Sequence, residues 1–149
     1  MSVRFEILAV GKAKKTDFAP MIELYRKRIG TSAKITITEI TTSDSSLENK
    51  ELETAIEARQ GFVFALDSRG KTMSSPDFSQ LLSDLKTRGE NNFIFIIGGS
   101  EGLSDNVKKY ADKTLSFGAQ TWPHMLARVM LLEQIYRSIQ IENGHPYHK

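Results

Sequence analysis

Apolar residues along the chain follow two spacings, one typical of helices and one typical of strands. Between residues 18 and 30 they keep the i, i+3, i+4, i+7 spacing of one helical face, formed by Phe18, Met21, Ile22, Tyr25 and Ile29. The run Phe93–Ile97 is instead short and wholly apolar, as in a buried strand. Because the two kinds of segment alternate along the chain, the sequence predicts an α/β fold with a mostly parallel sheet and flanking helices.

The predicted strands are Val3–Val10, the alternating stretch around Ile35–Ile37, Phe62–Leu66, Phe93–Ile97 and Thr114–Phe117. The predicted helices are Phe18–Ile29, Leu47–Arg59, Ser75 to Gly89, Ser104–Ala111 and Pro123–Asn143. The third helix should begin with Ser75 as its N-cap and Pro76 at its first position. No internal repeat or low-complexity linker interrupts the pattern, so residues 1–149 are predicted to form one domain.

The helix predicted at Pro123–Asn143 has a broad apolar surface, formed by Leu126, Val129, Met130, Leu132, Ile135, Tyr136 and Ile139. This surface is wider than the stripe that a helix on the outside of a monomer needs. Two explanations are open: the helix is buried wholly within one chain, or part of it packs against a second subunit. We favour the second explanation and therefore expect a homodimer.

Composition narrows the class of protein. The 149 residues include no Cys and three His, and 20 Lys and Arg against 18 Asp and Glu give a net charge of +2. The lack of Cys excludes disulfides, Cys-ligated zinc and thiol nucleophiles. The apolar runs are far shorter than the roughly 20 residues that cross a bilayer. We therefore expect a cytoplasmic protein with no membrane span, and, since no carboxylates accompany His145 and His148, no metal site.

Charge is distributed unevenly along the chain. From Arg4 to Lys34 there are eight basic and three acidic residues, whereas Asp44–Glu57 is mainly acidic. A basic segment is compatible with binding of RNA phosphates, but surface lysines and arginines also serve simply to keep a protein soluble. Charge alone leaves both interpretations open.

Three loops that follow predicted strands are candidates for ligand binding: Asp67–Ser75, Gly98–Gly102 and Gly118–Trp122. Ligands of parallel sheets bind beyond the carboxyl ends of the strands, where such loops converge. The glycine-rich loop fits neither the P-loop nor the dinucleotide-binding pattern. Asp67 could be the phosphoacceptor of a response regulator, but the segment after the first strand is basic, where that function needs acidic metal ligands.

Four motifs occur in a specific order along the chain. They are ILAVGK at 7–12, IIGGSEGL at 96–103, Pro123-His124 with Arg128-Val129 on the last helix, and HPYHK at 145–149. Together they resemble the RlmH family, the pseudouridine N3-methyltransferases of large-subunit ribosomal RNA within the SPOUT class. The resemblance covers essentially the whole chain.

The resemblance implies a SPOUT fold with a deep trefoil knot near the C-terminus. It also implies a homodimer in which the tail of one subunit completes the site of the other, and a substrate pseudouridine in 23S rRNA of the assembled ribosome. The cofactor would be S-adenosylmethionine, bound by Leu66, Gly98, Phe117, Gly118, Ala119, Gln120, Thr121 and Trp122.

Methyl transfer to the imide N3 of pseudouridine requires loss of its proton and stabilisation of the resulting charge. The candidates for proton handling are Tyr147 and His148, and those for charge are Arg128, Arg137 and Lys149. His124, one turn before Arg128, could share the pocket or be structural, and the identity of the base is open. Two rival hypotheses are a non-catalytic RNA- or ribosome-binding module with the same fold, and a nucleotide-sensing dimer.

Overall fold

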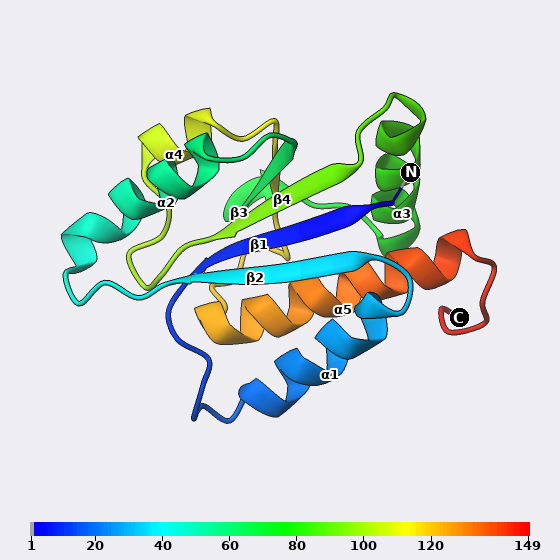
Figure 1. Cartoon of the computed structure of the whole chain (residues 1–149), viewed down its shortest axis with the longest axis horizontal. Coiled ribbons are helices and arrows are strands. Elements are labelled where there is room, and N and C mark those ends of the chain that lie inside the picture. Colours follow the sequence, from blue (N-terminus) through cyan, green and yellow to red (C-terminus); the bar gives the residue numbers. More distant parts are fainter. Residues whose placement is uncertain (1) are drawn as a thin grey trace.

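The computed structural model describes residues 2–149 and contains one five-stranded sheet, shown in Figure 1. Its strands are β1 (Arg4–Val10), β2 (Lys34–Ile40), β3 (Phe62–Lys71), β4 (Asn92–Ile97) and β5 (Lys113–Leu115). They lie in the order β2-β1-β4-β3-β5, and every neighbouring pair is parallel. The predicted α/β class and parallel sheet are confirmed.

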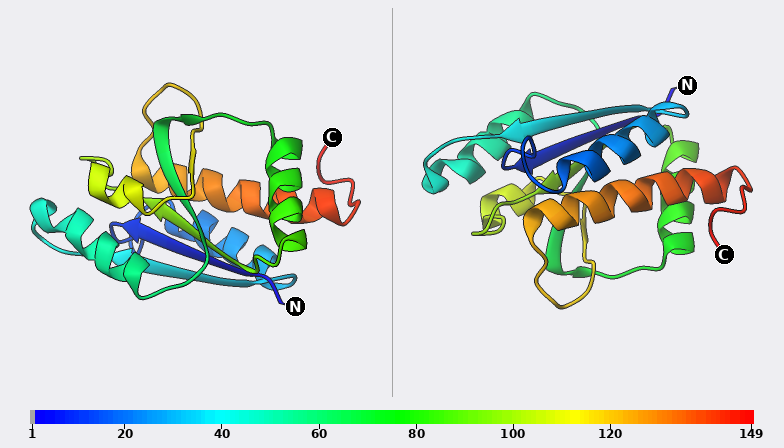
Figure 2. Two further views of the ribbon diagram at one scale, coloured as in Figure 1. Left: turned by 90° about the horizontal axis from the view of Figure 1, so that it is seen from above. Right: turned by 90° about the horizontal axis from the view of Figure 1, so that it is seen from below.

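Helices cover both faces of this sheet (Figures 1 and 2). They are α1 (Ala19–Gly30), α2 (Glu48–Glu57), α3 (Ser75–Thr87), α4 (Asp105–Lys109) and α5 (His124–Glu142), with a short 3-10 turn, η1 (Ser45–Leu47), before α2. Alternate residues of each strand point to opposite faces. Thus Phe93 and Phe95 of β4 join the core under α1, α3 and α5, whereas Ile94 and Ile96 pack toward α2 and α4. The predicted central position of this apolar strand is confirmed.

Two predicted strand boundaries are wrong. The third strand continues beyond Leu66 through Lys71, so the first half of the expected loop Asp67–Ser75 is strand, paired irregularly with β5. The last strand is Lys113–Leu115 rather than Thr114–Phe117. The residues of this extension are mostly polar, and beyond Ala65 β3 is paired with β5 rather than β4. A polar segment has no hydrophobic pattern from which a strand can be predicted.

The start of α3 also differs slightly from the prediction. Ser74, not Ser75, is the N-cap, and its hydroxyl accepts a hydrogen bond from the backbone amide of Asp77 at 3.1 Å. Pro76 therefore occupies the second helical position, where its missing amide proton still costs nothing. Ser75 is free to donate its hydroxyl to the Gln134 side chain at 2.6 Å, which ties α3 to α5.

Helix α5 runs between α1 and α3, opposite in direction to the strands (Figures 1 and 2). Its residues Met125, Val129, Leu131, Leu132 and Ile135 are buried, while Leu126, Met130, Tyr136 and Ile139 are half-buried. Packing within one chain therefore explains much of the broad apolar surface, and the homodimer stays a prediction. Its first turn lies at the carboxyl ends of the strands, and the C-terminal tail lies at their amino ends (Figure 1).

Candidate active site

A cleft of about 640 Å³ opens at the carboxyl ends of β3, β4 and β5. Its walls come from the end of β3, the loop after β4, the loop after β5 and the first turn of α5. Seven of the eight predicted cofactor-binding residues line it: Leu66, Gly98, Phe117, Gly118, Gln120, Thr121 and Trp122. Ala119 is exposed and is not part of the lining. His124 also lines the cleft, which agrees with the hypothesis that it shares the pocket.

Two glycines shape the cleft in different ways. A side chain at Gly98 would meet the backbone carbon of Gly102 at 2.9 Å, so Gly98 allows the 98–102 loop to close on itself. Gly118 has a φ of +112° and no heavy atom within 4 Å of the position its Cβ would occupy. A left-handed backbone conformation of this kind strongly favours glycine. Gly98 therefore maintains the loop, and Gly118 leaves open space beside the cleft.

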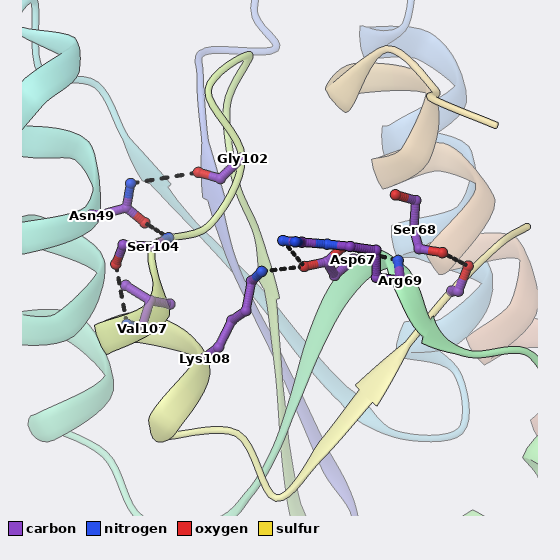
Figure 3. A network of polar contacts seen from close by, with 9 residues as sticks. Asn49, Asp67, Ser68, Arg69, Gly102, Ser104, Val107 and Lys108 are labelled. Atoms are coloured by element: carbon purple, nitrogen blue, oxygen red, sulfur yellow. Dashed lines mark hydrogen bonds and ion pairs between the residues drawn. The ribbon is translucent and has the colours of Figure 1, made fainter. Parts of the chain in front are cut away.

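Asp67 is held in the wall of the cleft by Lys108 and Arg69, as Figure 3 shows. Lys108 of α4 forms an ion pair with its Oδ2 at 2.5 Å, and the backbone amide of Arg69 donates to Oδ1 at 3.0 Å. Burial alone would raise the pKa of Asp67, but these hydrogen bonds outweigh it and lower the pKa to about 2. Asp67 is therefore an ionised structural group that attaches α4 to β3.

Side-chain hydrogen bonds also hold the other two loops (Figure 3). Asn49 of α2 accepts from the backbone amide of Ser104 at 2.8 Å and donates to the carbonyl of Gly102 at 3.4 Å. The Ser116 hydroxyl donates to the carbonyl of Ser68 and accepts from the amide of Gly118, both at 3.0 Å. The backbone around the cleft is thus fixed before any ligand binds.

Arg128 is buried beneath the start of α5, with 1% of its surface exposed. Its guanidinium donates to Glu39 of β2 at 2.6 Å and to the carbonyl of Gly11 at 3.2 Å. Glu39 also accepts from the backbone amide of Ala13 at 2.8 Å. Burial raises the pKa of Glu39, yet the bonds from Arg128 and Ala13 outweigh it and hold the pKa below its usual value. This placement gives Arg128 a structural partner and no exposed position in the cleft.

The other predicted catalytic residues gather on the last turns of α5. Arg137 donates to Glu133 at 2.9 Å, lies 4.7 Å from the centre of the Tyr147 ring, and contacts Nδ1 of His148 at 3.1 Å. Tyr147 donates its hydroxyl to Glu133. This hydrogen bond is the main reason that the pKa of Tyr147 lies well above its ordinary value. Lys149 is exposed at the end of the tail.

The cleft and the tail cluster lie far apart within one chain. Ala127 lines the cleft, and Arg137 is ten residues further along α5, which corresponds to about 15 Å along a helix axis. Figure 1 shows the first turn of α5 and the C-terminal tail at opposite ends of that helix. The structure of one chain therefore brings together the predicted cofactor residues, and separately the predicted tail residues, but does not join the two sets.

Comparison with known proteins places the chain in a family. The family described as "Predicted SPOUT methyltransferase" matches residues 3–148. The chain belongs to the SPOUT methyltransferase family. It is 43% identical to "Ribosomal RNA large subunit methyltransferase H" of Clostridium tetani, an alignment that covers 96% of this chain and 98% of that protein. The protein of the same name from Lactobacillus acidophilus is 37% identical, over 99% of this chain and 100% of that one.

Solved structures support the SPOUT fold independently of sequence. The tRNA (m1G37) methyltransferase of Aquifex aeolicus aligns with a TM-score of 0.54 and 16% identity, over 92% of this chain and 70% of that one. A methylase family protein of Neisseria gonorrhoeae gives 0.57 and 14%, over 99% of this chain and 87% of that one. Such similarity establishes the fold alone, and the trefoil knot implied by the resemblance stays a prediction.

Sequence reasoning missed two carboxylates that organise this SPOUT chain. Glu133 binds both Arg137 and Tyr147, and its i, i+4 spacing from Arg137 was the available signal. Glu39 had no such signal, because its partner Arg128 is 89 residues away in sequence. Among residues 2–149 no cluster of three His, Asp or Glu side chains is arranged to hold a metal ion. Within the same range, each helix is too short or too polar to cross a membrane.

Proposed function

We propose that the protein is a cytoplasmic S-adenosylmethionine-dependent methyltransferase that modifies N3 of a pseudouridine in 23S rRNA of the assembled ribosome. The observation that carries this proposal is the gathering of seven predicted cofactor residues in one cleft. Full-length relatives named as large-subunit ribosomal RNA methyltransferases support RNA as the substrate. The choice of pseudouridine N3 follows from the motifs at 7–12, 96–103 and 145–149, which resemble those of the RlmH family.

The cleft suits S-adenosylmethionine in size and in chemistry. Its volume lies in the range typical of small-molecule sites. Leu66, Phe117 and Trp122 offer apolar surface to an adenine ring, while the glycine-containing loops expose backbone groups to its polar atoms. A SPOUT-fold protein of Legionella pneumophila, 12% identical to this chain, has been solved with this cofactor bound. When bound, S-adenosylmethionine supplies the methyl group as an electrophile.

In this proposal the tail residues act on the cleft of a second copy of the chain. Tyr147, His148 and Arg137 lie at the other end of α5 from the cleft of their own chain. A homodimer with antiparallel α5 helices would bring each tail to the partner's cleft. The half-buried apolar residues of α5, such as Leu126 and Met130, would supply contact area. The catalytic site is then composite, built from two subunits.

Proton removal requires the tail to leave its present contacts. Tyr147 donates its hydroxyl to Glu133 and has a raised pKa, so it holds its proton in this arrangement. Because a guanidinium can only donate, the contact with Arg137 occupies the lone pair on Nδ1 of His148. In the proposed composite site, His148 accepts the imide proton of the pseudouridine. Arg137 and Lys149 stabilise the negative charge that this leaves on the pseudouridine ring. Arg128 acts as a positioning residue.

The proposal is tested with ribosomes from a strain that lacks the gene. The protein is incubated with these ribosomes and labelled S-adenosylmethionine, and mass spectrometry of digested 23S rRNA locates the modified nucleotide. We expect one methylated pseudouridine, and loss of methylation without loss of cofactor binding in His148→Gln. Glu142→Gln, an exposed change on the same helix end, serves as the matched control. Cofactor binding with no methylation of ribosomes would instead support a non-catalytic ribosome-binding module.

A further inference from the structure

A loop with three lysines lies beside the cleft and takes no part in the site described above. Lys12, Lys14 and Lys15 are exposed on the segment that joins β1 to α1. Within residues 2–149 none of the three side chains forms a hydrogen bond or an ion pair. Only Asp17 adds a negative charge to the same segment. The loop therefore presents a local excess of positive charge, although Glu39 of β2 partly offsets the charge of Lys12.

This loop is attached directly to the first turns of α5. A side chain at Gly11, which has a φ of +105°, would approach Nε2 of His124 to 2.9 Å, and His124 lines the cleft. The carbonyl of Gly11 accepts from Arg128 at 3.2 Å. Figures 1 and 2 show the loop beside the start of α5. The loop thus begins next to His124, a residue of the cleft lining, at the carboxyl end of β1.

The loop is also held rigidly. The backbone amide of buried Ala13 donates to Glu39 at 2.8 Å, and its carbonyl accepts from the hydroxyl of Thr16 at 2.6 Å. Lys12 and Lys14 therefore lie on either side of a residue whose backbone is fixed. Lys15 has a φ of +68°, a conformation that is unfavourable for residues with a Cβ. Such strain persists where the surroundings impose it and is concentrated at functional sites. A backbone fixed in advance loses little conformational freedom when the side chains on it bind a ligand.

We infer that Lys12, Lys14 and Lys15 bind phosphates of the RNA strand that enters the cleft. This inference rests on the proposed function, since it assigns RNA to that same site. Lysine binds phosphate as a compact point charge, without the paired geometry that reads a base edge. The described loop offers no amide or aromatic side chain between Lys12 and Asp17 that could recognise a base. The contact therefore positions RNA without selecting its sequence.

The test compares two variants that lose the same charge. The first is Lys12→Gln/Lys14→Gln/Lys15→Gln. The control, Lys34→Gln/Arg88→Gln/Lys109→Gln, removes three exposed cations outside this loop, at the start of β2, the end of α3 and the end of α4. Calorimetry measures S-adenosylmethionine affinity, steady-state kinetics measure KM and kcat for ribosomes, and sedimentation measures ribosome association against salt concentration. Thermal unfolding shows whether each variant is folded, and Lys14→Gln alone provides a milder version.

We expect the loop variant to bind S-adenosylmethionine normally and to raise KM for ribosomes by at least about tenfold, with kcat little changed. For this variant, the slope of the logarithm of the ribosome association constant against the logarithm of salt concentration should become less negative by about two to three. This change is close to one for each lost phosphate contact. The control variant should match the parent protein.

The outcomes separate this inference from the proposed function. If the parent methylates ribosomes and the loop variant does so with the same KM, the inference is overturned and the function stands. If the parent associates with ribosomes without methylating them, and the loop variant loses association, the inference holds and the proposed chemistry fails. A parent that does not associate with ribosomes, or that binds anionic vesicles instead, overturns both. Equal losses in the loop and control variants also overturn the inference.

Discussion

A single carboxylate controls the protonation of Tyr147. Because Glu133 accepts the Tyr147 hydroxyl, it holds the pKa of this phenol above its ordinary value. We predict that Glu133→Gln lowers that pKa toward the value of a free tyrosine. Titration of tyrosinate absorbance measures it. Glu57→Gln is the matched control, since Glu57 raises the pKa of Tyr110 in the same way. An unchanged Tyr147 titration in Glu133→Gln would show that the tail does not lie on α5 in solution.

Asp67 should make stability depend on pH in the acid range. Its pKa is about 2 in the folded protein, below the ordinary 3.8, so its ionised form stabilises the fold above pH 4. This stabilisation is lost as pH falls from about 4 through 2. We predict that Asp67→Asn lowers the free energy of unfolding by about 1 to 2 kcal/mol at neutral pH, and that the difference shrinks in this window. Denaturant unfolding at several pH values tests this, with Asp77→Asn as an exposed control. A difference that is constant with pH would contradict the assignment.

Residue identity alone did not reveal the environment of Arg128. An arginine on the helix that follows the last loop suggests contact with substrate, yet its side chain is buried against Glu39. No local pattern in the sequence reveals a partner on a distant strand, because such a pair depends on how the strands are ordered in the sheet. His124, in contrast, could be assigned to the cleft by its position on the first turn of the same helix.

Among the strands, the apolar β4 was predictable, whereas the polar extension of β3 was not. Strand β4 is apolar at nearly every position, so its central place in the sheet followed from its composition. The extension of β3 over Asp67–Lys71 is polar and pairs with β5 only after an irregularity. Its strand conformation depends on that neighbour rather than on its own residues. For the same reason the loops of the cleft could be located from the strand ends, but not their internal contacts.

The 98–102 loop is sensitive to any side chain at Gly98. A Cβ there would lie 2.9 Å from the backbone carbon of Gly102, so the loop must move to accommodate it. We predict that Gly98→Val remains folded and weakens S-adenosylmethionine binding by at least about tenfold. Gly30→Val is the matched control, because nothing lies within 4 Å of that position at the end of α1. Calorimetry with both variants decides, and an unchanged affinity in folded Gly98→Val would remove this loop from the site.

At the scale of the whole molecule, the position of the tail predicts a dimer. In one chain of 16.8 kDa, the cleft is lined by the first turn of α5, and the tail contacts Glu133 and Arg137 further along the same helix. We therefore expect light scattering at micromolar concentration to give twice that mass. Leu126→Lys and Met130→Lys place charge on half-buried positions of α5 and should shift the protein toward the monomer. A mass of one chain for the parent protein would exclude the composite site.

Subunit mixing provides the decisive test of a shared site. Deletion of residues 145–149 removes the contacts of Tyr147 with Tyr136, Glu133 and Arg137, all at the end of α5 and outside the buried core, so the fold should be retained with some loss of stability. Cofactor binding should persist in the truncated chain while methyl transfer is lost. Gly98→Val has the opposite defect, with an intact tail and an altered cleft.

When the truncated chain and Gly98→Val are produced together, random pairing makes about half of the dimers mixed. In each mixed dimer, the intact tail of the Gly98→Val chain faces the intact cleft of the truncated chain, so one of its two sites is complete. Activity should therefore return to about a quarter of that of the parent protein. If each tail serves the cleft of its own chain, every combination has an incomplete site. The mixture would then stay as inactive as either variant alone, because no pairing of subunits could supply the missing group.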